Sequence, residues 1–250
     1  MGDGEREGVG FHSPFPFSRS PCSSSAMRTP ILAALALVLA AAALLAAACA
    51  RRAPLLEPEP AALERPAPDS FVVAFETTRG RFDVLLRRHW SPAGVDRVHY
   101  LVRHGFYDGA RFFRVVPGFV AQFGLPADPA VAEAWRQRRL PDDTVRASNL
   151  RGRVSFARGG PGTRTTQLFV NLRDSPRLDT LNAFGFPPIG EVLGDGMTVV
   201  DSLHSGYGEE PPRGRGPAQD SIRVQGEAYL ARGWPELDAI RRAYLVTVWR

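Results

Sequence analysis

The sequence contains no lysine, so all 31 basic residues among its 250 are arginines. The formal net charge is +5. A coding bias toward arginine explains this charge better than phosphate binding, which would need the positive charge clustered on one face. We therefore expect no nucleic-acid partner.

Cysteine and histidine are also scarce, with two and five residues. Two cysteines exclude a disulfide framework and a cysteine-based metal site. The sequence also lacks a His-Glu-x-x-His motif, a Gly-Lys-Ser/Thr phosphate loop and a Gly-x-Ser-x-Gly elbow. We expect no metal, no cofactor and no covalent intermediate. The 24 glycines and 22 prolines indicate many turns and a mostly β body.

An apolar run, Ile31–Ala48, lies near the N-terminus. It follows Arg28 and ends in small residues, as an export signal does. The segment Leu45–Cys49 resembles a bacterial lipobox, which implies acylation of Cys49, although its leucine lies one position early. Cleavage after an Ala-x-Ala site and an uncleaved membrane anchor are the alternatives. We assign residues 27–49 to the signal and expect 1–26 to be disordered or a misassigned start.

Five prolines fall between Ala53 and Ser70. This spacing disfavours regular helix or sheet and favours extended segments. We therefore predict that residues 50–69 form a linker between the signal and the folded body.

Short β-rich runs with turn residues between them dominate the body, which predicts a β-barrel or sandwich rather than a doubly wound α/β fold. A hairpin is predicted where Thr77–Gly80 separates two runs. A helix is predicted from Ser91-Pro92 to Gly105, with serine at the N-cap. The other predicted strands are 111–116, 119–123, 154–157, 167–172 and 222–224, and the other predicted helices are 197–204 and one starting at Trp234-Pro235.

Three ordered blocks carry a resemblance to a known family. The first is FYDGARFFRVVPGFVAQ at 106–122. The second comprises GRVSFA at 152–157, TTQLFVN at 165–171 and LD at 178–179, and the third comprises FPPIGEV at 186–192, GM at 196–197 and VVD at 199–201. Together they resemble the cyclophilin-type peptidyl-prolyl isomerases. The resemblance implies a mainly β fold, an eight-stranded antiparallel barrel capped by two helices, over residues 70–230. Residues 231–250 would then form a C-terminal helical extension.

The resemblance also implies a set of site residues. Arg114 would be the catalytic cation, and Gln122 would hold the substrate carbonyl. If 111–116 is one continuous strand, Arg114 shares an apolar face with Phe112 and Val116. The proline pocket would be lined by Phe119, Val120, Phe169, Leu178 and Phe186, and the groove for preceding residues by Ala157, Arg158 and Gln167.

Departures from the family pattern leave two functions open. Arg158 stands where the family usually has asparagine, and Phe123 replaces a glycine and would narrow the groove floor. The first function is an isomerase that acts on Xaa-Pro bonds and assists folding of exported proteins. The alternative is a non-catalytic chaperone or scaffold module that binds proline-containing segments. We expect a monomer in the bacterial cell envelope, anchored as a lipoprotein or periplasmic.

Overall fold

The computed structural model describes residues 28–249, so the predicted segment 1–26 lies outside the described residues. Helix α1, Arg28–Leu56, contains the apolar run; the side chain of Cys49 is not among those described. The chain divides after Ala46 into two compact units, and the second contains the whole sheet. Among the described residues, no helix is both long and apolar enough to cross a membrane.

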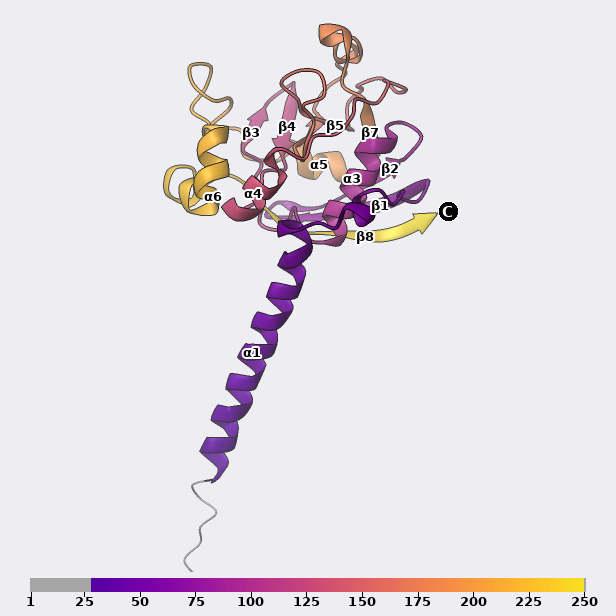
Figure 1. The fold of residues 1–250 in the computed structure, drawn as a ribbon. Coiled ribbons are helices and arrows are strands. Elements are labelled where there is room, and N and C mark those ends of the chain that lie inside the picture. Colours follow the sequence, from indigo (N-terminus) through magenta and orange to yellow (C-terminus); the bar gives the residue numbers. More distant parts are fainter. Residues whose placement is uncertain (1–27, 250) are drawn as a thin grey trace, which may run out of the picture. The chain divides into compact units, whose positions relative to one another are not determined.

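An eight-stranded antiparallel sheet forms the body of the second unit (Figure 1). Its strand order is β3-β4-β6-β5-β7-β2-β1-β8. The mainly β fold is confirmed, and so is the predicted hairpin, which is β1 and β2. The strands are β1 (Ser70–Thr77), β2 (Gly80–Arg87), β3 (Arg114–Val116), β4 (Val120–Phe123), β5 (Arg153–Phe156), β6 (Leu168–Asn171), β7 (Pro188–Val192) and β8 (Ile240–Trp249).

Of the predicted helices, the one that begins at Ser91-Pro92 is present as α3 and the one at 197–204 is present as the shorter α5. Two further helices, α4 and α6, accompany them. Helix α3 packs against β7 and β8, and α5 packs against β2. Helices α4 and α6 contact each other beside the sheet (Figure 1). The bounds are α3 (Pro92–Arg103), α4 (Pro129–Arg136), α5 (Gly196–Asp201) and α6 (Gln219–Gly233), with single turns at α2 (Pro60–Leu63), η1 (Pro176–Asp179) and η2 (Leu181–Ala183).

The C-terminal predictions were wrong in both places. The predicted strand 222–224 lies inside helix α6, and the predicted terminal helix is strand β8. Leu237, Ile240 and Tyr244 have helical spacing, but β8 pairs with β1 from Ser70 to Thr77. Without β8, this side of β1 would be an unpaired sheet edge. Pairing between distant segments therefore outweighs the local pattern.

The predicted extended linker was also wrong. Helix α1 continues through Pro54 to Leu56, and Pro60 begins α2 as the N-terminal residue of a helical turn. The last carbonyls of a helix have no partner within it. Here the Tyr100 hydroxyl donates to the Pro54 carbonyl at 2.8 Å, and the Trp135 indole N–H donates to the Leu55 carbonyl at 2.8 Å. Leu55 is buried, so this segment is docked on the folded unit.

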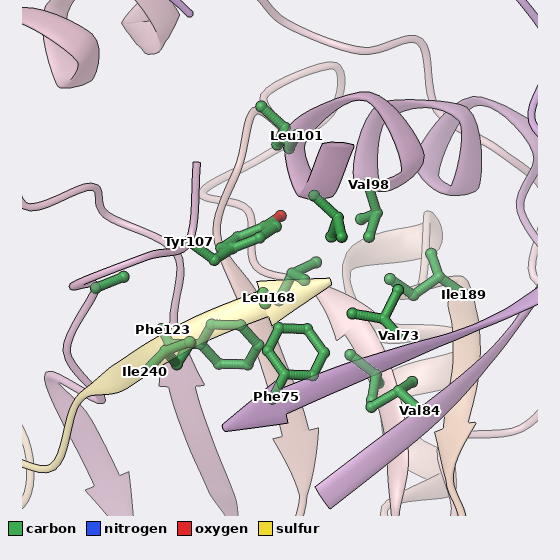
Figure 2. Close-up of a cluster of buried hydrophobic side chains, with 14 of the residues drawn as sticks. Val73, Phe75, Val84, Val98, Leu101, Tyr107, Phe123, Leu168, Ile189 and Ile240 are labelled. Atoms are coloured by element: carbon green, nitrogen blue, oxygen red, sulfur yellow. The ribbon is translucent and has the colours of Figure 1, made fainter. Parts of the chain in front are cut away.

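The main hydrophobic core lies between the curled sheet and helix α3. Figure 2 shows Val98 and Leu101 of α3 near side chains from several strands, including Phe75 and Phe123. Phe123 was expected to narrow the groove floor. Its ring instead lies 5.1 Å from that of Phe112 inside this core, so it does not reach the groove.

The N-terminus of α3 is capped by a distant carboxylate instead of by Ser91. Ser91 occupies the N-cap position but makes no capping bond. The Asp143 carboxylate accepts from the backbone N–H groups of Ala93 (3.2 Å) and Gly94 (3.1 Å) and from the Ser91 hydroxyl (2.5 Å). Asp143 lies in the segment 125–149, which connects β4 to β5. This part of the segment therefore stabilises the helix.

The segments before the two edge strands, β3 and β8, meet and join the ends of the sheet. Arg111 forms an antiparallel bridge with Ala239. Asp238, which is 5% exposed, holds this junction. Its carboxylate accepts from the Thr78 hydroxyl at 2.6 Å, the Arg79 guanidinium at 2.9 Å and the His204 backbone N–H at 2.6 Å. Burial alone would raise the pKa of Asp238, but these hydrogen bonds outweigh it and hold the pKa below its usual 3.8.

We expect Asp238→Asn to destabilise the fold most at neutral pH. Because the pKa of Asp238 is lower in the folded state, its contribution is complete above about pH 4 and is lost as the pH falls through the depressed pKa. Urea unfolding of the wild type and of Asp238→Asn from pH 7 to pH 3 measures the free energy of unfolding of each. The difference in free energy of unfolding should shrink below pH 4, and a difference that stays constant with pH would contradict the assignment.

Candidate active site

A row of paired residues crosses three strands on the sheet face opposite the core. Arg114 of β3 pairs with Gln122 of β4, which pairs with Phe169 of β6. Directly paired residues place their side chains on the same face. The next row along, which includes Val115 and Val170, belongs to the main core. The alternation of the strands therefore directs Arg114, Gln122 and Phe169 outward together.

The predicted surroundings of Arg114 were partly wrong. Regular pairing in β3 begins at Arg114, so the chain from Arg111 to Val116 is not one continuous strand. Phe112 therefore lies in the main core with Val115, and it does not share a face with Arg114. Phe113 packs in a separate cluster against α6. The apolar neighbour of Arg114 is instead Phe119, whose ring centre lies 5.4 Å from the guanidinium carbon.

A chain of polar side chains fixes the guanidinium. Arg114 Nη1 donates to Gln122 Oε1 at 3.1 Å, and Gln122 Nε2 donates to Gln167 Oε1 at 2.8 Å. On its other side, Arg114 Nη2 donates to Glu209 Oε1 at 2.6 Å. Gln122 and Gln167 are both buried, whereas the Arg114 side chain is 22% exposed. The guanidinium is thus held in place while part of it faces the solvent.

An apolar pocket lies beside this polar chain. Val120, Phe169 and Leu178 form a buried cluster, separate from the main core, against which Phe119, Ala157 and Phe186 pack. The rings of Phe169 and Phe186 meet edge to face at 5.9 Å.

The segment that carries Leu178 and Phe186 is fixed to the sheet by hydrogen bonds. The Phe186 N–H donates to the Leu178 carbonyl at 2.8 Å, and Asn149 Nδ2 donates to the Phe186 carbonyl at 2.9 Å. Asn149 is fully buried, so it supports the Phe186 wall of the pocket from inside the protein.

The guanidinium and the apolar pocket open into one groove of about 820 Å³. The structure brings all the predicted site residues of the folded unit to this groove. They are Arg114, Phe119, Val120, Gln122, Ala157, Arg158, Gln167, Phe169, Leu178 and Phe186. An apolar recess can bind a ring, and a guanidinium beside the recess can polarise an amide attached to that ring.

Arg158 meets the groove as a buried side chain, only 3% exposed. Its guanidinium pairs with Asp142 at 3.2 Å, donates to the Gly185 carbonyl and lies 5.1 Å from the Phe186 ring centre. Burial lowers the pKa of Arg158, and Asp142 opposes this shift. The Arg158 side chain therefore ties the wall of the pocket to the segment 125–149.

The residues that close the groove on the side of α6 were not predicted from the sequence. Glu209 and Arg213, from the segment between α5 and α6, line it together with Arg223 of α6. Glu209 binds Arg114, a residue 95 positions earlier. The hydrogen bond from Arg114 lowers the pKa of Glu209, so this carboxylate is ionised at neutral pH. No local pattern in the sequence indicates such a distant contact.

Comparisons with known proteins agree with this geometry. The family model for "cyclophilin type peptidyl-prolyl cis-trans isomerase" matches residues 72–225. Peptidyl-prolyl cis-trans isomerase-like 3 of Gibberella zeae is 33% identical over 142 residues, which cover 53% of this chain and 83% of that protein. Peptidyl-prolyl cis-trans isomerase A of Dickeya dadantii is 33% identical over 135 residues, which cover 52% and 70%.

Solved structures show the same fold. A cyclophilin-type peptidyl-prolyl cis-trans isomerase of Cryptosporidium parvum superposes with a TM-score of 0.50 at 17% identity, over 71% of this chain and 98% of that one. A second structure of the same protein, in the presence of the dipeptide Ala-Pro, has a TM-score of 0.50 at 16% identity, over 70% and 99%. On the sequence match and the fold together, this chain belongs to the cyclophilin-type peptidyl-prolyl cis-trans isomerase family.

Proposed function

We propose that the groove accelerates rotation about Xaa-Pro peptide bonds in exported proteins and so assists their folding. One observation carries the proposal: the Arg114 guanidinium is fixed beside an apolar pocket that would accept a proline ring. The related structure in the presence of Ala-Pro supports a ligand of this class.

The reaction needs electrostatic stabilisation and breaks no covalent bond. Amide resonance sets a rotation barrier of about 18–20 kcal/mol. In the twisted state resonance is lost, and the proline nitrogen becomes pyramidal and basic. A cation that donates to this nitrogen binds the twisted amide more tightly than the planar one, which lowers the barrier.

Arg114 is placed for that role. Two of its five N–H donors are used by Gln122 and Glu209, so the others remain for a substrate. Burial of the proline ring among Val120, Phe169 and Leu178 would supply roughly 1.5–3 kcal/mol of binding. Gln122 would hold the substrate carbonyl.

The residues before proline would lie along Ala157, Arg158 and Gln167, which line the same groove. The bond between Gln122 and Gln167 links this part of the groove to the guanidinium.

A coupled isomerisation assay on an Xaa-Pro peptide tests the activity. We expect the protein to accelerate cis-to-trans conversion in proportion to its concentration, and Arg114→Ala to abolish most of the acceleration. Binding of the peptide with no acceleration by either protein would instead support the non-catalytic chaperone or scaffold module.

We further propose that Cys49 is acylated and anchors the enzyme in the bacterial cell envelope as a lipoprotein. The apolar run Ile31–Ala48 and the lipobox-like segment that ends at Cys49 support this. Labelling of the full chain with a fatty-acid probe in a bacterial host should be lost in Cys49→Ser and kept in Cys22→Ser. Labelling that persists in Cys49→Ser would contradict the assignment and favour the Ala-x-Ala or uncleaved alternative.

A further inference from the structure

The segment 205–217 lies between α5 and α6. Its Glu209 carboxylate contacts the Arg114 guanidinium in the groove. The Glu209 side chain is 16% exposed. Its Oε1 accepts from Arg114 at 2.6 Å, and its Oε2 pairs with Arg213 Nε at 2.8 Å. Both oxygens of this carboxylate therefore face a guanidinium, and of the two only Oε1 accepts a hydrogen bond among the described residues.

This segment is itself held by hydrogen bonds. The Gly216 N–H donates to the Glu209 carbonyl at 2.7 Å, and the Arg215 N–H donates to the Tyr207 carbonyl at 2.9 Å. The Trp234 indole N–H donates to the Arg215 carbonyl at 2.6 Å, which connects the segment to the end of α6.

The turn is so tight that a Cβ on Gly214 would lie 2.2 Å from the Glu209 carbonyl oxygen. The backbone therefore fixes where the Glu209 carboxylate can reach.

Glu209 and Gln122 bind the Arg114 guanidinium from two sides. An arginine side chain has several rotatable bonds, and one hydrogen bond leaves its guanidinium free to swing. Here Gln122 accepts from Nη1 and Glu209 accepts from Nη2, with the Phe119 ring beside the group. Removing Glu209 would leave Gln122 as the one hydrogen-bond acceptor for this guanidinium among the described residues.

We propose that Glu209 is a positioning residue for the isomerase reaction, which holds the Arg114 guanidinium in the orientation that meets the twisted peptide bond. This inference rests on the proposed function of Arg114. The ion pair leaves N–H donors of Arg114 for the substrate, so it orients the cation without occupying it. The lowered pKa of Glu209 keeps the pair charged through the neutral range.

The test compares Glu209→Ala, Glu209→Gln and the control Glu64→Ala in the isomerisation assay, with kcat and KM measured separately. Glu64 is an exposed carboxylate that is not part of the groove lining. We expect Glu209→Ala to lower kcat about tenfold with little change in KM, because a misplaced catalytic group loses rate. Glu209→Gln keeps an acceptor oxygen and should recover most of the loss. Glu64→Ala should match the wild type.

A second readout does not depend on activity. In ¹⁵N NMR of the arginine side chains, the two Nη resonances of Arg114 should be resolved in the wild type because the guanidinium rotates slowly. They should merge in Glu209→Ala and stay resolved in Glu64→Ala. Arg114→Ala assigns the signals.

The outcomes separate the two claims. Absence of acceleration by the wild type would refute the proposed function, and wild-type activity in Arg114→Ala would refute the role proposed for Arg114, whatever Glu209 does. A large loss in Arg114→Ala with unchanged or raised kcat in Glu209→Ala would overturn the positioning role and leave the proposed function standing; a raised kcat would show that Glu209 restrains the enzyme. If Glu209→Ala unfolds, as seen by circular dichroism, Glu209→Met decides instead, because methionine keeps the side-chain length without the acceptor oxygens that Arg114 and Arg213 contact. A kcat and Nη resonances that both match the wild type in Glu209→Met would overturn the positioning role.

Discussion

Replacing Arg114 with alanine is expected to lower kcat/KM on an Xaa-Pro peptide by about 100- to 1000-fold, the range found when one preorganised donor to a transition state is removed. This large loss is expected because of the position of the Arg114 guanidinium. Its guanidinium is held between Gln122 and Glu209 beside the apolar pocket, so no reorganisation is needed when the amide twists. Arg114→Lys should recover little, because an ammonium lacks the fork that spans both acceptors and the substrate.

Arg241→Ala is the control, since it removes an exposed arginine on β8 that is not part of the groove lining. Its kcat/KM should equal that of the wild type. Because the Arg114 side chain lies outside the core, the free energy of unfolding should change little in Arg114→Ala. Full activity of Arg114→Ala in a folded protein would show that catalysis uses another group.

Replacing Arg164 with alanine is expected to lower the free energy of unfolding by about 3–5 kcal/mol, as the loss of one partner from a buried ion pair does. The Arg164 side chain is fully buried and donates to Asp143 at 3.0 Å, to Ser91 at 3.3 Å and to the Pro141 carbonyl. Without it, Asp143 stays buried with its charge unpaired at the N-terminus of α3. For a domain of this size the melting temperature should fall by roughly 6–20 °C.

Urea and thermal unfolding measure this loss. Arg139→Ala is the matched control, because Arg139 is exposed and has no ion pair among the described residues; its stability should change by less than about 0.5 kcal/mol. Arg164→Met restores packing volume but still leaves Asp143 unpaired, so it should recover only part of the loss. If the free energy of unfolding of Arg164→Ala stays within about 1 kcal/mol of that of the wild type, the contacts of Arg164 with Asp143, Ser91 and Pro141 are not what mainly stabilises α3.

The sequence was most informative where neighbours in the chain are also neighbours in the fold. The hairpin and the helix that begins at Ser91-Pro92 are of this kind. The placing of the site residues depended on the family resemblance, and strand pairing shows why they converge. Arg114 lies opposite Gln122, and Gln122 lies opposite Phe169, so three short strands bring them onto one face.

The features that sequence reasoning missed depend on distant partners. β8 is a strand because β1 offers it an edge along eight residues, and the spacing of Leu237, Ile240 and Tyr244 fits a helix equally well. Glu209 reaches Arg114 across 95 positions. Pro54 sits in a helix because the Tyr100 hydroxyl and the Trp135 indole take the carbonyls at its end. These contacts are set by tertiary packing, which local patterns do not encode.

The docking of Leu55 on the folded unit limits how far the enzyme could work from a bilayer. Leu55 follows Cys49 by six residues, which as helix span only about 9 Å. If Cys49 is acylated as proposed, its acyl chains would hold the folded unit, and with it the groove, close to the lipid surface.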